Sequence, residues 1–294
     1  MQGANLSAVT EFILIGFSTF PHLQLTFFLL FLLMYLFTLL GNLLIMATIW
    51  RERSLHTPMY LFLCALSISE ILYTFAIIPR MLAALLSTHH SIAFSACASQ
   101  MFFSFTFGFT NSFLPGGCAC LVVWSWAGGL VMGLVGTSAI FHLTFCGPNM
   151  IHHFFCHMPP LVKLACGDIS TVITGVGLVC LSALLGCCLL ILLSYAFIVA
   201  AILRIPSAEG RHKTFSTCVS HLTVVIVHYG FASIIYFKPK GPQSLEGDTL
   251  MGITYTVLTP FLSPIIFSLR NKELKNTMKK TFLNKFFLHS FSGT

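Results

Sequence analysis

The side chains with the widest chemical repertoire are eleven cysteines, and their surroundings divide them into two groups. Seven lie in or beside long apolar stretches, where a free cysteine is a small hydrophobic side chain: Cys64, Cys118, Cys120, Cys180, Cys187, Cys188 and Cys218. The other four border or lie within polar segments: Cys97, Cys146, Cys156 and Cys166. In an oxidising compartment these four form disulfides, and spacing alone does not choose among their three pairings. Joining Cys97 to Cys156 would close a loop of about 60 residues, worth about 4 kcal/mol.

Histidines beside one of these cysteines allow a second interpretation, a metal site. His153 and His157 would share a helical face, and His152 and Cys156 add further ligand types. A disulfide at Cys156 and ordinary histidines in a polar loop explain the same residues. The disulfide with ordinary loop histidines is favoured over the metal site, so the sequence predicts neither a metal nor a cofactor.

Glu70 is an acidic residue inside an apolar stretch, where an ionisable group suggests a function. A carboxyl group in such surroundings needs partners or a proton, and Asn42 and Ser263 on other apolar stretches are the candidate partners. The alternative is a protonated carboxyl group that only bonds its neighbours. The chain shows no phosphate-binding loop, no nucleophile with a base and no paired carboxylates, so we do not expect an enzyme.

Composition defines the elements that must position these residues. Of 294 residues, 56% are hydrophobic and 8% are charged, and the mean hydropathy is +0.91. Soluble domains carry about 25% charged residues. The chain is therefore predicted to be an all-α polytopic membrane protein, and its net charge of +7 is assigned to basic ends of membrane helices rather than to nucleic-acid binding.

Seven apolar stretches are long enough to be membrane helices, at about 23–49, 58–82, 97–114, 118–141, 172–203, 214–237 and 250–269. The segment 1–22 has no Lys or Arg, which places the N-terminus outside and makes Asn5, in Asn5-Leu6-Ser7, a glycosylation candidate. Residues 23–270 then form a seven-helix domain. Eleven of the fifteen Lys and Arg fall inside: residues 51, 53, 204, 211, 213, 270, 272, 275, 279, 280 and 285.

The third and fourth stretches are separated by three residues, Pro115-Gly116-Gly117. If they formed one crossing, every later loop would change sides and the basic loop at 204–213 would lie outside. Two crossings are therefore expected, with a shortened hairpin in which helix three is about 27 Å long. Gly129 and Gly133 make a small-residue face that favours close helix packing.

The segment 271–294 is interpreted as a cytoplasmic tail with an amphipathic helix in the membrane interface. Its apolar residues recur every four positions and its lysines fall elsewhere. The alternative is a disordered basic tail. The apolar residues are Leu274, Met278, Phe282 and Phe286.

Several motifs together resemble the olfactory receptors, a rhodopsin-like family of G-protein-coupled receptors, over about residues 8 to 280. They are Gly41-Asn42, the stretch Leu55 to Tyr60, Ser194-Tyr195, the stretch Lys213 to His221, and the stretch Pro264 to Asn271. The resemblance implies disulfides Cys97–Cys156 and Cys146–Cys166, a plasma-membrane location and signalling through an olfactory stimulatory G protein. It also implies that a small volatile ligand binds in the outer half of the bundle, at Ser104, Phe105, Gly108, Phe109, Tyr229, Thr254 and Tyr255.

One part of the family pattern is missing. Members carry a Met-Ala-Tyr-Asp-Arg-Tyr-Val-Ala-Ile-Cys stretch at the inner end of helix three, whereas here Leu114 runs directly into Pro115. Ser263 and Phe267 also depart from the usual Asn-Pro-x-x-Tyr motif of helix seven. We therefore expect ligand binding to persist and G-protein coupling to fail. Two explanations of the missing segment stay open, a truncated non-signalling receptor remnant or a deletion that the shortened hairpin tolerates. A transporter is the alternative from another class.

Overall fold

The computed structural model describes residues 9–16, 21–87, 91–113, 119–146, 148–167, 169–204, 206–212 and 252–280, with single residues between 215 and 230. The bundle helices in this part of the chain are α1 (Gln24–Arg51), α2 (Pro58–Leu86), α3 (Phe94–Phe113), α4 (Ala119–Phe141), α6 (Ser170–Leu203) and α9 (Thr259–Arg270). Shorter helical turns are η1 (Pro21–Leu23), η2 (Arg53–Leu55), α5 (Met158–Leu164), η3 (Thr254–Leu258) and α10 (Lys272–Met278).

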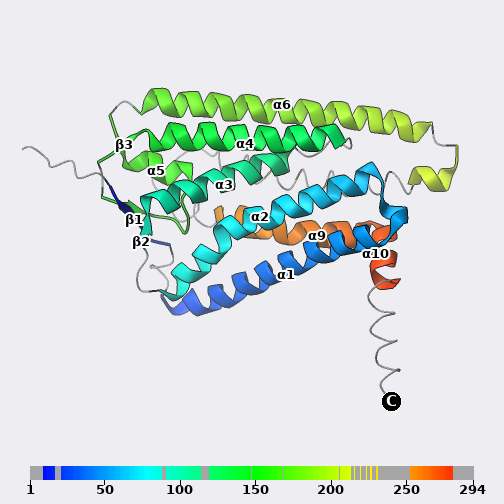
Figure 1. Cartoon of the computed structure of the whole chain (residues 1–294), viewed down its shortest axis with the longest axis horizontal. Helices are drawn as coiled ribbons and strands as arrows, with labels where there is room; N and C mark the ends of the chain where they lie inside the picture. The colour runs from blue at the N-terminus through cyan, green and yellow to red at the C-terminus, as the bar shows by residue number, and fades with distance from the viewer. Residues whose placement is uncertain are drawn as a thin grey trace, which may run out of the picture.

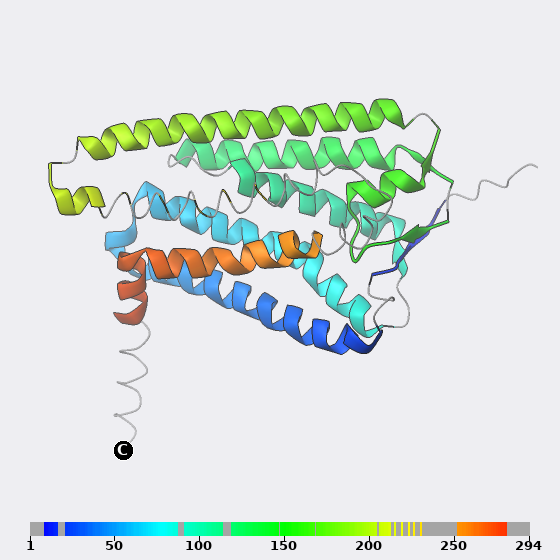
Figure 2. The ribbon, with the colours of Figure 1, turned by 180° about the vertical axis from the view of Figure 1, so that it is seen from behind.

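The long helices lie side by side, with α6 next to α4 on the side of the bundle away from α1 (Figures 1 and 2). Three of the described helices are long and apolar enough to cross a membrane, within Gln24–Arg51, Tyr60–Leu86 and Val122–Phe141. Their side chains are exposed over much of the surface, as expected of helices that face lipid. The prediction of a helical membrane bundle is confirmed, while most of the predicted helix at 214–237 lies outside the described residues.

Helices α3 and α4 pack closely because glycines on α4 admit the α3 backbone. A Cβ on Gly129 would collide with the Thr110 hydroxyl and lie 2.5 Å from the Thr106 carbonyl oxygen. A Cβ on Gly133 would collide with the Thr106 hydroxyl group and lie 3.1 Å from the Phe102 carbonyl oxygen. The small-residue face predicted on helix four therefore lies against helix three.

The two ends of the bundle differ. At the end that we call the disulfide end, strand β1 (Glu11–Leu14) pairs antiparallel with β2 (Ser91–Ala93) and parallel with β4 (Met150–Ile151). A second pair joins β3 (Thr144–Phe145) to β5 (Ala165–Cys166). These strands were not predicted, because two to four residues are too few to show an alternating pattern. The glycosylation candidate Asn5 lies outside the described residues.

A buried cluster lies beneath these strands. Phe12 on β1 is fully buried, with its ring 5.5 Å from that of Phe145 and 6.0 Å from that of Phe94. The segment predicted to be a polar N-terminus therefore contains a strand that contributes to the core.

The opposite end, which we call the tail end, carries α10, which turns away from the bundle axis (Figure 1). Leu274 is fully buried in a cluster with Ile45, Ile49 and Phe267, and Met278 packs against it. Asn271 caps the helix by accepting a hydrogen bond from the Leu274 N–H at 3.0 Å. The predicted positions Phe282 and Phe286 lie outside the described residues.

Candidate ligand-binding site

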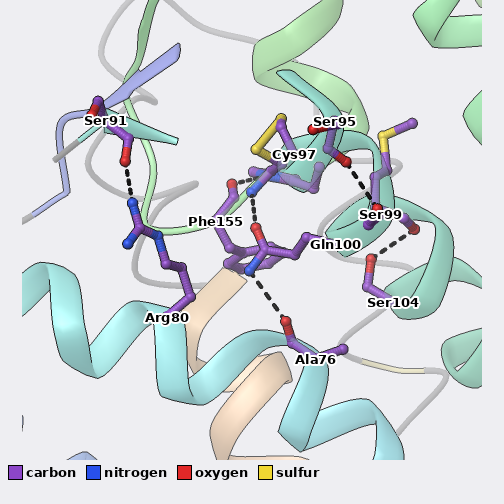
Figure 3. The surroundings of a disulfide bond; sticks show 12 residues. Ala76, Arg80, Ser91, Ser95, Cys97, Ser99, Gln100, Ser104 and Phe155 are labelled. Atoms are coloured by element: carbon purple, nitrogen blue, oxygen red, sulfur yellow. Dashed lines mark hydrogen bonds between the residues drawn. A yellow bond between two sulfur atoms is a disulfide. The ribbon is translucent and has the colours of Figure 1, made fainter. Parts of the chain in front are cut away.

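A disulfide between Cys97 and Cys156 joins the start of α3 to the segment between α4 and α6 (Figure 3). Both cysteines are fully buried, and their Cα atoms lie 5.4 Å apart. Gln100, one turn further along α3, accepts a hydrogen bond from the Cys156 N–H at 2.9 Å and donates one to the Ala76 carbonyl oxygen at 3.3 Å. This buried glutamine therefore ties the segment to α2 and α3 together.

Gln100 was not among the residues predicted from the sequence. The available signal was its position three residues after Cys97 in a stretch without charged residues. A long polar side chain there requires a partner once it is buried.

Two further contacts stabilise the disulfide end. Cys146 and Cys166 form the second disulfide, with Cα atoms 5.7 Å apart, and it joins the paired strands β3 and β5. Arg80 on α2 donates a hydrogen bond to the carbonyl oxygen of Ser91 on β2 (Figure 3). Both disulfides are the pairings that the family resemblance implies.

The helix-three candidates do not share one environment. Gly108 faces α2, since a Cβ there would lie 3.6 Å from the ring of Tyr73. Phe105 faces α4, because a Cβ on Gly136 would lie 3.0 Å from its ring, and the ring of Phe109 is 6.1 Å away. Ser104 donates its hydroxyl hydrogen bond to the carbonyl oxygen of Met101 on its own helix. Gly108 is therefore the candidate that borders the space between α2 and α3.

Of the other candidates, Tyr229 lies outside the described residues, and the side chains of Thr254 and Tyr255 are not described. The backbone of the last two lies in η3, a π-helical turn. Near this turn an apolar cluster, which we call the aromatic cluster, joins α1, α2, α3, η3 and the segment after Cys146. Its buried members are Phe31, Tyr35, Tyr73, Ile77, Ile78, Met81, Leu82, Leu85, Phe107, Phe154, Phe155, Ile253 and Val257.

The histidines considered as metal ligands form a pair at the edge of this cluster. The ring centroids of His153 and His157 lie 4.0 Å apart. Burial lowers the pKa of His153 well below its ordinary value and that of His157 to about 4, with nearby positive charge adding to both effects. No group of three or more His, Cys, Asp or Glu side chains gathers in the described part of the chain.

The intramembrane candidates come together from three helices. Glu70 on α2 is buried, and its carboxyl group accepts a hydrogen bond from the Asn42 amide of α1 at 3.2 Å and contacts the hydroxyl of Ser263 on α9. Beside them, a Cβ on Gly41 would lie 2.8 Å from the Pro264 side chain, so glycine allows α1 and α9 to touch. Two motifs of the resemblance, Gly41-Asn42 and the stretch from Pro264, thus meet beside Glu70.

This arrangement is that of a multi-pass helical membrane protein with the rhodopsin fold. The crystal structure of squid rhodopsin matches with a TM-score of 0.61 at 12% identity, covering 89% of this chain and 86% of that one. At this identity the match concerns the fold alone.

The family follows from the sequence comparisons. The family model for olfactory receptors matches residues 31–123 and 117–285. Human olfactory receptor 10H1 is 76% identical over 98% of both chains, and human olfactory receptor 10H5 is 74% identical over 98% of this chain and 99% of the relative. The chain belongs to the olfactory receptor family, whose members are receptors rather than enzymes.

The comparisons also locate the segment that this chain lacks. The alignment with olfactory receptor 10H1 spans 311 positions, more than the 294 residues of this chain. The relative therefore carries residues that are absent here. The two parts of the family match overlap at residues 117–123, close to Pro115, where the inner end of helix three was expected to be missing.

Proposed function

We propose that this chain is an odorant receptor of the plasma membrane, with its N-terminus and disulfide end outside, which binds a small volatile molecule between α2, α3 and η3. Membership of the olfactory receptor family is the observation that carries the proposal. The aromatic cluster and Gly108 supply an apolar environment of the kind that binds such molecules.

The disulfide between Cys97 and Cys156 supports a preorganised binding site at the same end. They hold the segment that carries Phe154 and Phe155 against α2 and α3, so these rings contribute to the aromatic cluster. The proposed binding site is thus covered by a segment with little freedom to move. Such preorganisation reduces the entropy that ligand binding would otherwise cost.

Coupling to a heterotrimeric olfactory stimulatory G protein is the family role, and the missing segment bears on it directly. Described helix α3 ends at Phe113 and α4 begins at Ala119. Activation requires an element whose two states bind the partner differently. We propose that this chain retains ligand binding and lacks efficient coupling to the G protein. The reason is that helix three offers few residues at the tail end for a G protein to bind.

The experiment compares the chain as written with a restored chain that carries the family's missing segment between Leu114 and Pro115. Volatile compounds are screened on the restored chain by cAMP release, with surface staining of both chains in cells lacking other such receptors. Active compounds are then tested for thermal stabilisation of the chain as written in lipid nanodiscs. We expect stabilisation without a cAMP rise. A clear agonist-dependent cAMP rise from the chain as written would contradict the loss of coupling, and a failure of both chains to bind any compound would contradict the receptor function.

A further inference from the structure

Positively charged side chains gather at the tail end of the bundle, on two segments that lie far apart in the sequence. The segments 51–57 and 270–285 hold eight Lys and Arg residues against two acidic ones, Glu52 and Glu273. Positive charges gathered on one surface repel one another unless an anion lies beside them. Within these segments the described cationic side chains are Arg51, Arg53, Lys275, Lys279 and Lys280.

One apolar cluster brings the two segments together. Ile49 near the end of α1 and Leu55 of η2 are buried in it with Leu274 of α10, and Met278 packs against the same cluster. Helix α10 lies crosswise to the long helices (Figures 1 and 2). Because the long helices cross the membrane, a helix that lies crosswise at their end runs along the membrane surface.

The cations lie beside the buried residues on both segments. Arg51 and Arg53 are exposed and stand between the buried residues of the α1–η2 segment. On α10, Lys275 and Lys279 are four residues apart and share one helix face, next to the face that Leu274 buries. Lys279 is exposed and Lys275 is half-buried. Each segment thus buries apolar side chains and exposes cations, as interfacial helices do.

Trp50 indicates the depth of this surface in the membrane. Its side chain is 84% exposed at the tail end of α1, directly before Arg51. Exposed tryptophans at the ends of membrane helices lie at the level of the lipid headgroups. With the tail end in the cytoplasm, as proposed above, the neighbouring cations lie beside the anionic headgroups of the cytoplasmic leaflet.

We infer that the segment from Arg51 to Leu55 and helix α10 together form a docking surface for anionic phospholipids, whose headgroups contact Arg51, Arg53, Lys275 and Lys279. The occupant is a lipid rather than a free phosphate, because the cations border an apolar cluster and an interfacial tryptophan. The inference rests on the proposed orientation of the chain and is independent of odorant binding.

The test uses the full chain in nanodiscs of neutral phosphatidylcholine. Dioctanoyl phosphatidylserine is titrated in, and the rise of the thermal midpoint gives its dissociation constant. Dioctanoyl phosphatidylcholine, which has the same acyl chains and no net charge, is the lipid control, and glycerophosphoserine is the headgroup without acyl chains. The variants Arg53→Gln and Lys279→Gln each remove one exposed cation. Lys163→Gln is the matched control, because Lys163 is an exposed cation on α5 at the disulfide end.

In the wild type, phosphatidylserine is expected to bind more tightly than phosphatidylcholine, by a margin that shrinks as salt increases. Arg53→Gln and Lys279→Gln should each weaken phosphatidylserine binding about fivefold, as for one charge near a membrane surface. Lys163→Gln should leave it unchanged. Equal weakening by Lys163→Gln and Lys279→Gln would overturn the inference, and glycerophosphoserine that binds as tightly as the lipid would overturn the assignment to a lipid.

Should a variant fail to fold, the comparison of the two lipids on the wild type still decides, because equal binding of both overturns the inference. Odorant-dependent stabilisation is measured on the same samples. A wild type that responds to odorants and does not prefer phosphatidylserine overturns this inference alone, and one with the opposite behaviour overturns the proposed ligand binding alone.

Discussion

The disulfide end and the tail end of this receptor are held together by different kinds of interaction. The disulfide end has two covalent links, five short strands and the buried Gln100 within the described residues. The tail end depends on side-chain contacts, such as the hydrogen bonds between Tyr60 and Asn271 and the burial of Leu274. The end proposed to bind ligand is thus rigid, and the end proposed to meet a G protein is held by weaker contacts.

The same comparison explains how this chain can lack a family segment and still fold. Close packing of α3 against α4 depends on Thr106, Gly129 and Gly133, which all lie outside the missing segment. The link from α3 to the loop depends on Cys97 and Cys156. The described contacts of α3 with α4 and with the loop therefore do not depend on residues of that segment.

The largest effect is expected where the disulfide end loses its main link. Replacing Cys97 or Cys156 by Ser opens a loop of 59 residues, which costs about 4 kcal/mol in the chain-entropy model. We expect almost complete loss of surface staining. Cys180→Ser, at a free cysteine, is the control and should stain normally. Peptide mapping without reductant that finds Cys97 and Cys156 as free thiols in the wild type would refute the link itself.

The next largest effect is expected from a charge change at Glu70, whose buried contacts with Asn42 and Ser263 lie between the two ends. Glu70→Lys adds a buried charge of opposite sign, at about 2.5–3.5 kcal/mol for a charge at mid-membrane, and removes the acceptor of the Asn42 amide. Glu70→Gln keeps the shape and an acceptor oxygen. Surface staining should be lost in the first variant and kept in the second, and equal staining of the two would contradict the contact with Asn42 and Ser263.

A smaller loss of stability is expected from a change at the interface between α3 and α4. Gly133→Val places a side chain against the Thr106 hydroxyl and the Phe102 backbone, which overpacking data put at about 1–3 kcal/mol. The thermal midpoint in nanodiscs should fall. Gly175→Val on α6 is the matched control, because a Cβ there meets nothing within 4 Å. A matching fall for both variants would argue against specific packing of α3 on α4.

At the tail end, Asn271→Ala removes the cap of α10 and the contact with Tyr60, at a cost of about 1 kcal/mol. We expect a modest fall in the thermal midpoint and unchanged ligand stabilisation, since the cap is at the opposite end from the proposed binding site. Asn271→Ser, which can still cap, should recover most of the loss. Weakened ligand binding in Asn271→Ala would show that the two ends are more tightly coupled than the contacts indicate.

The smallest effect at neutral pH is expected of the histidine pair. The pKa of His157 is lowered from 6.5 to about 4 and that of His153 is lowered too, so the unfolded chain binds more protons between these values. Stability is therefore present above about pH 6.5 and falls as the pH drops towards 4. The double variant His153→Phe and His157→Phe should lose this part of the pH dependence of the thermal midpoint, and an unchanged pH profile would contradict it.

Much of the architecture could be read from the sequence. Long apolar stretches and the distribution of Lys and Arg depend on local composition, so they identify membrane helices and their order without knowledge of contacts. The motifs at Gly41-Asn42 and from Pro264 to Asn271 were likewise visible, and with the other motifs they carried the resemblance to the family. The first five predicted helices agree with the described bounds to within a few residues, because each helix satisfies its own backbone hydrogen bonds. The predicted helix 250–269 is divided into η3 and α9, and most of the predicted helix 214–237 lies outside the described residues.

Contacts between distant residues were decided only by the tertiary structure. Composition does not say that Gln100 bonds Cys156, that Gly252 makes room for His153, or that β1 pairs with strands about 80 and 140 residues away. Such pairings depend on which surfaces meet after the helices pack, and short strands carry no periodic signal of their own. The metal site and the disulfide at Cys156 competed for the same residues in the sequence, and it is packing that brings Cys97 to Cys156 and leaves the histidines beside an aromatic cluster.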